Sequence, residues 1–302
     1  MKTSPWKKIK KCKYLYIMML LPIIYYILFH YLPLYGVLIA FKDYKIAKGV
    51  WGSPWVGFKW FEKFLADPYF WKLVKNTLLL NIYGLLWGFP VPILLALMLN
   101  EVTNAKFKRA IQTVSYLPHF ISTVVVCGMV MNFLSLDGII NQIIAAFGFD
   151  KIQFMVLPEW FRTIFTASGI WQTCGWTSII YLSALTSVDQ EILEAAMIDG
   201  CNPLQTYFRV VFPILKPTAI TVAILNVMWI WNDFLLPYLV IGISTRYKTI
   251  PVVIQMLVGT NGNKDLGALM AMLVLSIVPI VIFYMACQKY IIEGVVAGAV
   301  KG

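Results

Sequence analysis

The sequence predicts an all-α, polytopic membrane protein with six membrane-spanning helices, and three observations lead to this prediction. Of the 302 residues, 60% are apolar and only 13% are charged, whereas about 25% of the residues of a typical soluble domain are charged. Six apolar runs are each long enough to cross a hydrocarbon core of about 30 Å as a helix. The sequence shows none of the short alternating strands that a membrane β-barrel needs.

The six apolar runs follow one another with polar connections too short to form a separate soluble domain. We therefore expect a single membrane domain. Prolines inside several runs do not exclude helices, because neighbouring helices can satisfy the carbonyl groups that proline frees, but they indicate kinks. The predicted spans are Tyr14–Ala40, Leu73–Leu99, Tyr116–Leu136, Ile164–Ser187, Thr218–Ser244 and Leu266–Ala286.

The formal net charge of +11 would suggest a nucleic-acid partner in a soluble protein. Here the basic residues flank membrane spans, and no nucleic acid is expected. Lys and Arg divide almost evenly between the two sides, but the lysine cluster beside the first span places the N-terminus in the cytoplasm. Six spans return the C-terminus to the same side. The predicted segments are a cytoplasmic tail (1–13), a membrane domain (14–290) and a second cytoplasmic tail (291–302).

One long polar stretch, residues 188–213, separates the fourth and fifth spans. The capping-box pattern at Ser187–Gln190 predicts the start of a helix. Gly200 suits the left-handed residue that follows a helix, and Asn202-Pro203 suits the start of a second one. We expect Pro213 to end that second helix. The stretch therefore predicts a cytoplasmic pair of short helices, neither of which can span the membrane.

The second of these helices is expected to carry an apolar, largely aromatic face. Leu204, Tyr207, Phe208 and Val211 recur at the spacing of one helical face. A lone helical hairpin cannot bury such a face, so something must cover it. The residues alone leave open whether the cover is the rest of this chain or another protein.

The same stretch is similar to the EAA loop of binding-protein-dependent ABC importer permeases. That pattern is E-A-A, three residues, Gly, nine residues and I-x-L-P. It is matched by Glu194-Ala195-Ala196, Gly200 and Val210-x-Phe212-Pro213, with Val210 and Phe212 in place of the common Ile and Leu. The stretches YLPHFIS, WNDFLLP and EGVVAGAVKG resemble carbohydrate-importer permeases, and the resemblance covers nearly the whole chain.

The resemblance implies a type I ABC importer permease fold and a place in a bacterial cell (inner or plasma) membrane, surrounded by lipid. A second permease would complete the pore, cytoplasmic ATPase subunits would grip the loop, and an external solute-binding protein would deliver the cargo. The implied cargo is a sugar derived from an oligosaccharide or polysaccharide. The residues implied in ATPase coupling are Glu194, Ala195, Ala196, Gly200 and Pro213, with Arg209 as a further candidate contact.

The chain lacks the motifs of an ATPase or an enzyme. It has no G-x-x-x-x-G-K-[ST] loop for phosphate, and no nucleophile elbow or pair of catalytic acids is evident. Its two histidines and five cysteines lie far apart in the sequence, so no metal site is expected. We therefore expect no catalytic residue and no cofactor, with ATP and Mg²⁺ bound by the partner ATPase subunits.

A cargo pathway is indicated by polar and aromatic residues inside the spans. Asp233 is the only acidic residue in the predicted spans, and an ionisable group there is a functional candidate by default. Trp229 and Asn232 beside it offer an aromatic face and a hydrogen-bonding group for a sugar. A structural role for this cluster remains equally open at this point. Weaker candidates of the same kind are Gln172, Trp176, Asn76 and Asn81.

Two other functions fit parts of the sequence. An ion-coupled carrier acting alone would use Asp233 as its cation site, although a single intramembrane acid and the lack of internal repeats argue against it. An ABC permease for another solute, such as a peptide, would share the architecture. Glycines within the spans are expected to permit close helix packing; these are Gly84, Gly88, Gly128 and Gly175.

Overall fold

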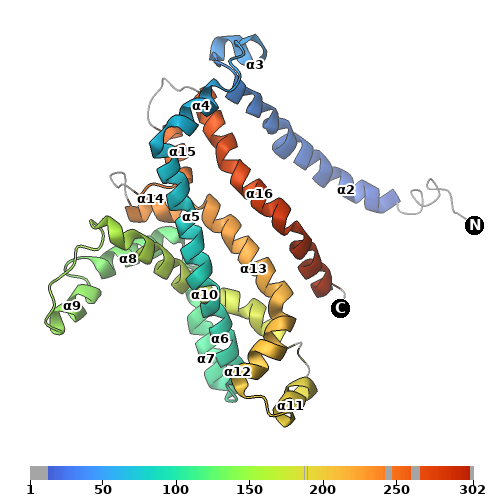
Figure 1. Cartoon of the computed structure of the whole chain (residues 1–302), viewed down its shortest axis with the longest axis vertical. Helices are drawn as coiled ribbons and strands as arrows, with labels where there is room; N and C mark the ends of the chain where they lie inside the picture. The colour runs from blue at the N-terminus through green and yellow to red at the C-terminus, as the bar shows by residue number, and fades with distance from the viewer. Residues whose placement is uncertain (1–12, 187, 189, 242–246, 260–265, 300–302) are drawn as a thin grey trace, which may run out of the picture. The chain divides into compact units, whose positions relative to one another are not determined.

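The computed structural model describes residues 13–186, 188, 190–241, 247–259 and 266–299, and most of them are helical (Figure 1). Within these ranges the only extended pairing is one antiparallel bridge, between Lys42 and Trp55. The predicted all-α fold class is confirmed. The chain divides into two compact units: Met1–Ala66 with Thr260–Leu275, and Asp67–Gly259 with Ser276–Gly302.

The first unit contains the first predicted span. Helix α2 (Lys13–Tyr26) continues through a π-helical turn (Ile27–Tyr31) and a 3-10 helix (Leu32–Phe41), so that Lys13–Phe41 forms one helical run of 29 residues. Almost all of its apolar side chains are exposed. Apolar side chains at this density need lipid around them, which fits the prediction for Tyr14–Ala40.

A small core closes the first unit. Trp60 and Phe61 of α4 (Lys59–Ala66) pack with Ala40 and Ala271. The Trp60 indole N–H donates to the Lys42 carbonyl oxygen at 3.1 Å, which satisfies both buried polar groups. The loop between the first span and α4 also contains a 3-10 turn (Ile46–Lys48) and the short helix α3 (Gly49–Gly52).

The second span consists of two collinear helices, α5 (Pro68–Gly88) and α6 (Pro90–Glu101), which together cover 34 residues. Asp67 caps α5, since its carboxylate accepts the Tyr69 backbone N–H at 2.8 Å. The cap at Asp67 and the proline at the first helical position start this helix more than one turn before the predicted start at Leu73. The observed span is longer at its N-terminus than the predicted Leu73–Leu99.

The third span begins later than predicted. Helix α7 (Ala105–Tyr116) is followed by a 3-10 turn (Leu117–Phe120), and α8 (Thr123–Leu134) starts only where Ser122 accepts the Val125 N–H. Pro118 and this cap separate α7 from α8, so the start predicted at Tyr116 is wrong. Helix α9 (Ile139–Ala146) extends the apolar stretch.

The fourth span is the central helix of the second unit. Helix α10 (Phe161–Leu185) has 25 residues, follows a 3-10 turn at Pro158–Trp160, and contacts α5, α6, α7 and α13. Among the described residues, five other helical segments are apolar enough to be recognised as spans by length and composition alone. Helix α10 is more polar because it contains several Ser and Thr residues, whose hydroxyl groups donate to carbonyl oxygens of the same helix. With it, each of the six predicted spans has a helical counterpart.

The fifth span is broken and the sixth is long. Helix α13 (Phe212–Asn232) stops before Asp233, and α14 (Leu235–Ile241) follows it, so the unbroken helix predicted for Thr218–Ser244 is wrong. The end of that prediction lies outside the described residues. A short helix that the sequence did not indicate, α15 (Ile250–Gly259), precedes α16 (Leu266–Ala299), which runs well beyond the predicted end at Ala286.

Two clusters of buried side chains hold the second unit together. One joins α5, α8, α10 and α14 through residues such as Leu80 and Phe165, and the other joins α6, α10 and α13 through Tyr181 and Leu215. A side chain at Gly84 would overlap Ile230 of α13, so close packing is confirmed there. At Gly128, no atom of the described part of the chain lies within 4 Å of the position of a Cβ, so close packing is not seen there within this chain.

Candidate functional site

The candidate coupling loop begins with α11 (Gln190–Ile198), which ends at Gly200 in the predicted left-handed conformation (φ 81°). Cys201 donates its N–H to the Ala196 carbonyl oxygen, and Gly200 donates to the Met197 carbonyl oxygen, each at 3.0 Å. These two bonds form a Schellman motif, which satisfies the last carbonyl groups of the helix. The capping residue Ser187, predicted to start this helix, lies outside the described residues.

The second helix of the loop starts as predicted and ends differently. Asn202 and Gln205 cap each other, since each side-chain oxygen accepts the other residue's backbone N–H, and α12 begins at Pro203. Helix α12 (Pro203–Thr206) then passes through a π-helical turn (Tyr207–Val211) directly into α13.

Pro213 therefore does not end the second helix, and that prediction is wrong. A proline inside an α-helix removes one hydrogen bond, and its ring collides with the carbonyl group four residues earlier. The preceding π-helical turn is wider, and its last bond joins the Phe212 N–H to the Tyr207 carbonyl oxygen. The wide turn makes room for the proline ring, so the loop is continuous with the span that follows it.

One side of the loop is anchored in the bundle. Ala196 and Val211 are buried, and Leu193 and Tyr207 pack against the cluster that contains Leu215. The fourth and fifth spans contribute to the same cluster. The loop is therefore packed against its own chain on this side, so the chain itself covers part of the apolar face of the loop.

The other side of the loop is exposed and partly apolar. Ile198, at the end of α11, exposes 86% of its surface, and Met197 and Phe208 are also exposed. Glu194, Ala195 and Arg209 lie on exposed positions as well. Figure 1 shows α11 and α12 at one end of the second unit, the same end as the connection between α6 and α7. The exposed side is thus available to another protein.

The predicted pathway residue Asp233 is not in a helix. Its backbone is extended (φ −68°, ψ 119°), and its carboxylate accepts the Leu236 N–H at 3.4 Å, at the start of α14. Asp233 therefore lies just beyond the end of α13 and not inside the continuous helical span predicted for it. The side chain is partly buried at a break between two helices, where it satisfies one of the free N–H groups of α14.

Trp229 and Asn232 remain on an exposed side of α13. Trp229 exposes 78% of its surface, whereas its neighbour Trp231 exposes 5% and donates its indole N–H to the Ser276 carbonyl oxygen at 3.0 Å. The exposed Asn232 donates its amide to the Met228 carbonyl oxygen of its own helix. Near Asp233, the side of α13 that carries Trp229 and Asn232 is open to a molecule outside this chain.

All four weaker candidates make contacts within the chain, and Asn76 does so through hydrogen bonds with Arg162 and the Lys248 carbonyl oxygen. The Gln172 amide donates to the Ile121 carbonyl oxygen at 3.0 Å, at the break before α8. Trp176 stacks on His119 with ring centroids 4.7 Å apart. Asn81 is buried and donates to Thr77, and its carbonyl oxygen has no partner in the described part of the chain.

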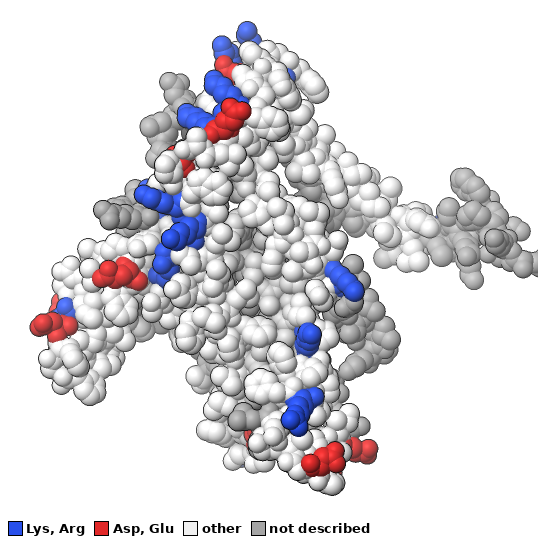
Figure 2. Space-filling view, in the orientation of Figure 1, with Lys and Arg blue, Asp and Glu red and all other residues white. Residues whose placement is uncertain are grey.

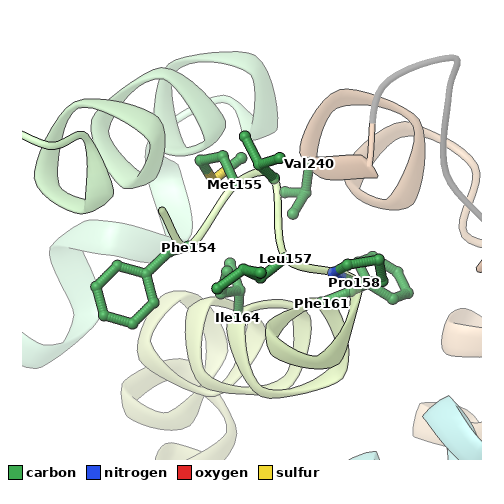
Figure 3. A pocket seen from close by; sticks show the side chains of 8 residues that line it. Phe154, Met155, Leu157, Pro158, Phe161, Ile164 and Val240 are labelled. Atoms are coloured by element: carbon green, nitrogen blue, oxygen red, sulfur yellow. The ribbon is translucent and has the colours of Figure 1, made fainter. Parts of the chain in front are cut away.

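The structure also contains an open cavity that the sequence pattern does not indicate. The apolar pocket drawn in Figure 3 is lined by Phe154, Met155, Val240 and their neighbours, and its volume of about 10 Å³ is too small for a sugar. An open cavity of about 810 Å³ lies instead beside the first turns of α5 and α10. The sequence does not indicate this group of residues, because Arg162 and Tyr247 are far from Lys72 in the sequence and come together with it only in the folded chain.

Comparison with known proteins places this geometry in a family. Residues 88–296, which include the coupling loop and four of the spans, match the model of the binding-protein-dependent transport system inner membrane component. The chain belongs to this family. The resemblance noted from the loop is therefore confirmed, and the chain is a permease subunit of an ABC importer.

The permease has relatives named for sugar transport. It is 44% identical over 221 residues to the Bacillus subtilis polygalacturonan/rhamnogalacturonan transport system permease protein YteP, covering 73% of this chain and 69% of the relative. It is 32% identical over 227 residues to the starch degradation products permease AmyC of Thermoanaerobacterium thermosulfurigenes, covering 75% of this chain and 74% of the relative.

A solved structure shares the fold of the permease. The crystal structure of a bacterial ABC transporter that imports the acidic polysaccharide alginate contains a chain with 34% identity and a TM-score of 0.80. The match covers 94% of this chain and 98% of that one. The type I importer fold is thus confirmed across nearly the whole permease, and an ion-coupled carrier acting alone is disfavoured.

Proposed function

We propose that this permease imports an oligosaccharide, or the sugars derived from a polysaccharide, and forms half of the translocation pore. The support comes from relatives that are named for polygalacturonan, starch products and alginate. Peptide import by the same architecture is the competing possibility. Uptake of labelled oligosaccharides and of labelled peptides by the reconstituted importer separates the two possibilities. Only the true cargo is expected to be taken up and to stimulate ATP hydrolysis.

The permease is proposed to act with three kinds of partner. A second permease subunit completes the pore, because six spans from one chain enclose too little space for an oligosaccharide. Cytoplasmic ATPase subunits bind ATP and Mg²⁺, which this chain has no motif to hold. An external solute-binding protein delivers the cargo, as in the alginate importer, which has been solved in complex with a pentasaccharide-bound periplasmic protein.

The coupling loop is proposed to dock against an ATPase subunit. The observation that carries this proposal is a capped helical hairpin that is anchored in the bundle on one side and presents Ile198 and Phe208 on the other. Glu194, Ala195 and Arg209 would lie in or beside the contact, and Ala196 would anchor the helix. Closure of the ATPases would move the loop, and the continuous helix from α12 into α13 would carry the motion into the membrane.

The cargo pathway is proposed to run along the exposed side of α13. Trp229 offers a ring face for stacking on a sugar, and Asn232 offers hydrogen bonds. Asp233 lies at the adjacent helix break. Because Gln172, Trp176 and Asn81 make contacts within the chain, we propose that they shape the path indirectly, by holding neighbouring segments in place.

The orientation is proposed to be that of a multi-pass protein of the bacterial plasma membrane with both termini in the cytoplasm. The tails at 1–13 and 291–302 and the loop at 188–213 would then face the ATPases. The starts of α5 and α10 would face outward. The hydrogen bond from Arg162 to Asn76 joins these two helix starts at one end of the bundle, and the lysine cluster before the first span is what supports placing that end outside.

The docking proposal is tested by replacing the exposed isoleucine of the loop. Ile198→Asp places a charge on the apolar contact, so we expect loss of the ATPase subunits during purification and loss of uptake. Ile46→Asp is the matched control, because Ile46 is similarly exposed (80%) but belongs to the loop proposed to lie outside. If Ile198→Asp retains the ATPases as well as Ile46→Asp does, the docking proposal is wrong.

A further inference from the structure

The open cavity beside the starts of α5 and α10 carries a concentrated positive charge. Its volume of about 810 Å³ is that of a small-molecule site. Lys72 and Lys75 lie one helical turn apart on α5, and Arg162 reaches the cavity from α10. Figure 2 shows Lys and Arg side chains gathered over the first turns of α5. The residues that line the cavity are Tyr69, Lys72, Lys75, Asn76, Leu79, Arg162 and Tyr247, with no carboxylate among them.

The guanidinium group of Arg162 is held in place from two sides. One of its N–H groups donates to the Asn76 side-chain oxygen at 3.3 Å, and its Cζ atom lies over the Tyr247 ring, 4.9 Å from the ring centre. Asn76 is itself buried and donates its amide to the Lys248 carbonyl oxygen at 3.3 Å. Residues from three segments that are distant in the sequence thus hold the Arg162 guanidinium group in one position. A planar donor that is already held in position loses little freedom when it binds a carboxylate, which favours that binding.

Within the described residues, the lysine charges in the cavity have no partner that neutralises them. In the described part of the chain, Lys72 and Lys75 have neither a hydrogen-bond acceptor nor an ion-pair partner. Asp67, the acidic residue that immediately precedes α5, directs its carboxylate to the Tyr69 backbone N–H as the cap of that helix. Three like charges around one cavity repel one another, and a bound anion relieves that repulsion.

We propose that this cavity receives a uronate oligosaccharide, a sugar chain that carries carboxylates, at the outer mouth of the permease. The inference rests on the proposed function and adds the charge of the cargo and the residues that recognise it. Two lysines on one helix and an arginine on another match carboxylates repeated along a chain better than one compact lipid phosphate. Tyr69 and Tyr247 add ring faces against which sugars pack.

Direct binding tests this assignment. The importer complex in nanodiscs of zwitterionic lipid, without solute-binding protein, is titrated with trigalacturonate and with its methyl ester, which has the same rings and no charge. We expect the acid to bind at least about tenfold more tightly than the ester, and Lys72→Gln with Lys75→Gln to remove about that factor for the acid alone. Binding of the acid should weaken as the ionic strength rises, whereas binding of the ester should not.

The control variant carries Lys48→Gln and Lys151→Gln, which remove the same charge from exposed positions outside the cavity. It should bind the acid as the unmodified complex does. Arg162→Lys keeps the positive charge but removes the planar guanidinium group that can bind a carboxylate through two hydrogen bonds. We therefore expect an intermediate loss of affinity for the acid. Equal binding of acid and ester, or equal loss in the control, overturns the inference.

Two further outcomes separate this inference from others. If anionic phospholipid co-purifies with the complex, disappears in the Lys72→Gln/Lys75→Gln variant, and trigalacturonate does not bind, the cavity is a lipid site and the inference is wrong. Uptake by the complete importer is measured alongside with neutral oligosaccharides. Uptake of neutral oligosaccharides without any uptake of trigalacturonate would leave the proposed function standing and overturn only the uronate assignment.

Discussion

Gly175 of α10 lies against the backbone of Ser115 in α7, so closely that a Cβ at Gly175 would overlap the Ser115 carbonyl group. Glycine therefore sets the distance between these two helices. The contact joins the central helix of the second unit to the segment that precedes the third span. Because backbone rather than a flexible side chain occupies the space, the neighbouring helix must move to admit even a methyl group.

Gly175→Ala should accordingly destabilise the permease by about 1–3 kcal/mol, the usual range for an overpacked site. Thermal unfolding in mild detergent measures the change. Gly128→Ala is the control, because a Cβ at Gly128 of α8 meets no atom of this chain within 4 Å and alanine is the better helix former. An equal fall in both variants would contradict the packing explanation.

The bend of the coupling loop gives a second prediction. Gly200 has a φ of 81°, and a Cβ there meets no atom within 4 Å, so substitution changes only the backbone preference. Gly200→Val should strain the bend by about 1–2 kcal/mol or more, whereas Gly200→Asn should be tolerated better. We expect ATP-driven uptake to fall in the valine variant and to persist in the asparagine variant. Intact assembly and uptake with valine would refute the coupling role of the bend.

Substitutions of two neighbouring tryptophans on α13 are expected to affect different properties, one the stability of the permease and the other its transport activity. Trp231 is buried and hydrogen-bonded to Ser276, so Trp231→Ala should lower stability by about 3–5 kcal/mol. Trp229 is exposed, so Trp229→Ala should leave the unfolding temperature nearly unchanged and reduce uptake of the sugar. Thermal unfolding and uptake assays on the same two preparations measure both effects. Normal uptake in the Trp229 variant would remove that residue from the pathway.

Substitutions of Asp233 distinguish a role as a helix cap from a role as a cation site. The carboxylate accepts the Leu236 N–H, and an asparagine oxygen can do the same. Asp233→Asn should therefore preserve folding and ATP-driven uptake, while Asp233→Ala should cost about 0.5–2 kcal/mol of stability. Loss of uptake in a stable Asn variant, together with a response to an imposed ion gradient, would instead favour a charge-dependent role.

The caps and the bend of the coupling loop could be predicted from local sequence. Gly200 and the Asn202-Pro203 start behave as expected because both depend on backbone preferences that a few neighbouring residues decide. The helix end predicted at Pro213 failed for a related reason. A rule for α-helical geometry does not anticipate a π-helical turn, which admits the proline ring and lets the helix continue.

The candidate pathway was predicted less well, because residue type does not reveal direction. Trp229 and Trp231 are alike in the sequence, yet one is exposed and the other is buried against Ser276. Asp233 stood out as an acid in an apolar run, but the helix ends one residue before it and its carboxylate serves as a cap. Only the packing of α13 against its neighbours decides which side is free.

The sequence by itself determined the helical class, the number of spans and the capped loop, since these follow from hydrophobic length and local backbone chemistry. The tertiary structure alone decided which side of each helix is open and which distant residues meet. Lys72, Arg162 and Tyr247 line one cavity because α5, α10 and the segment before α15 come together in the folded chain. Contacts between segments so far apart depend on packing, which no local pattern records.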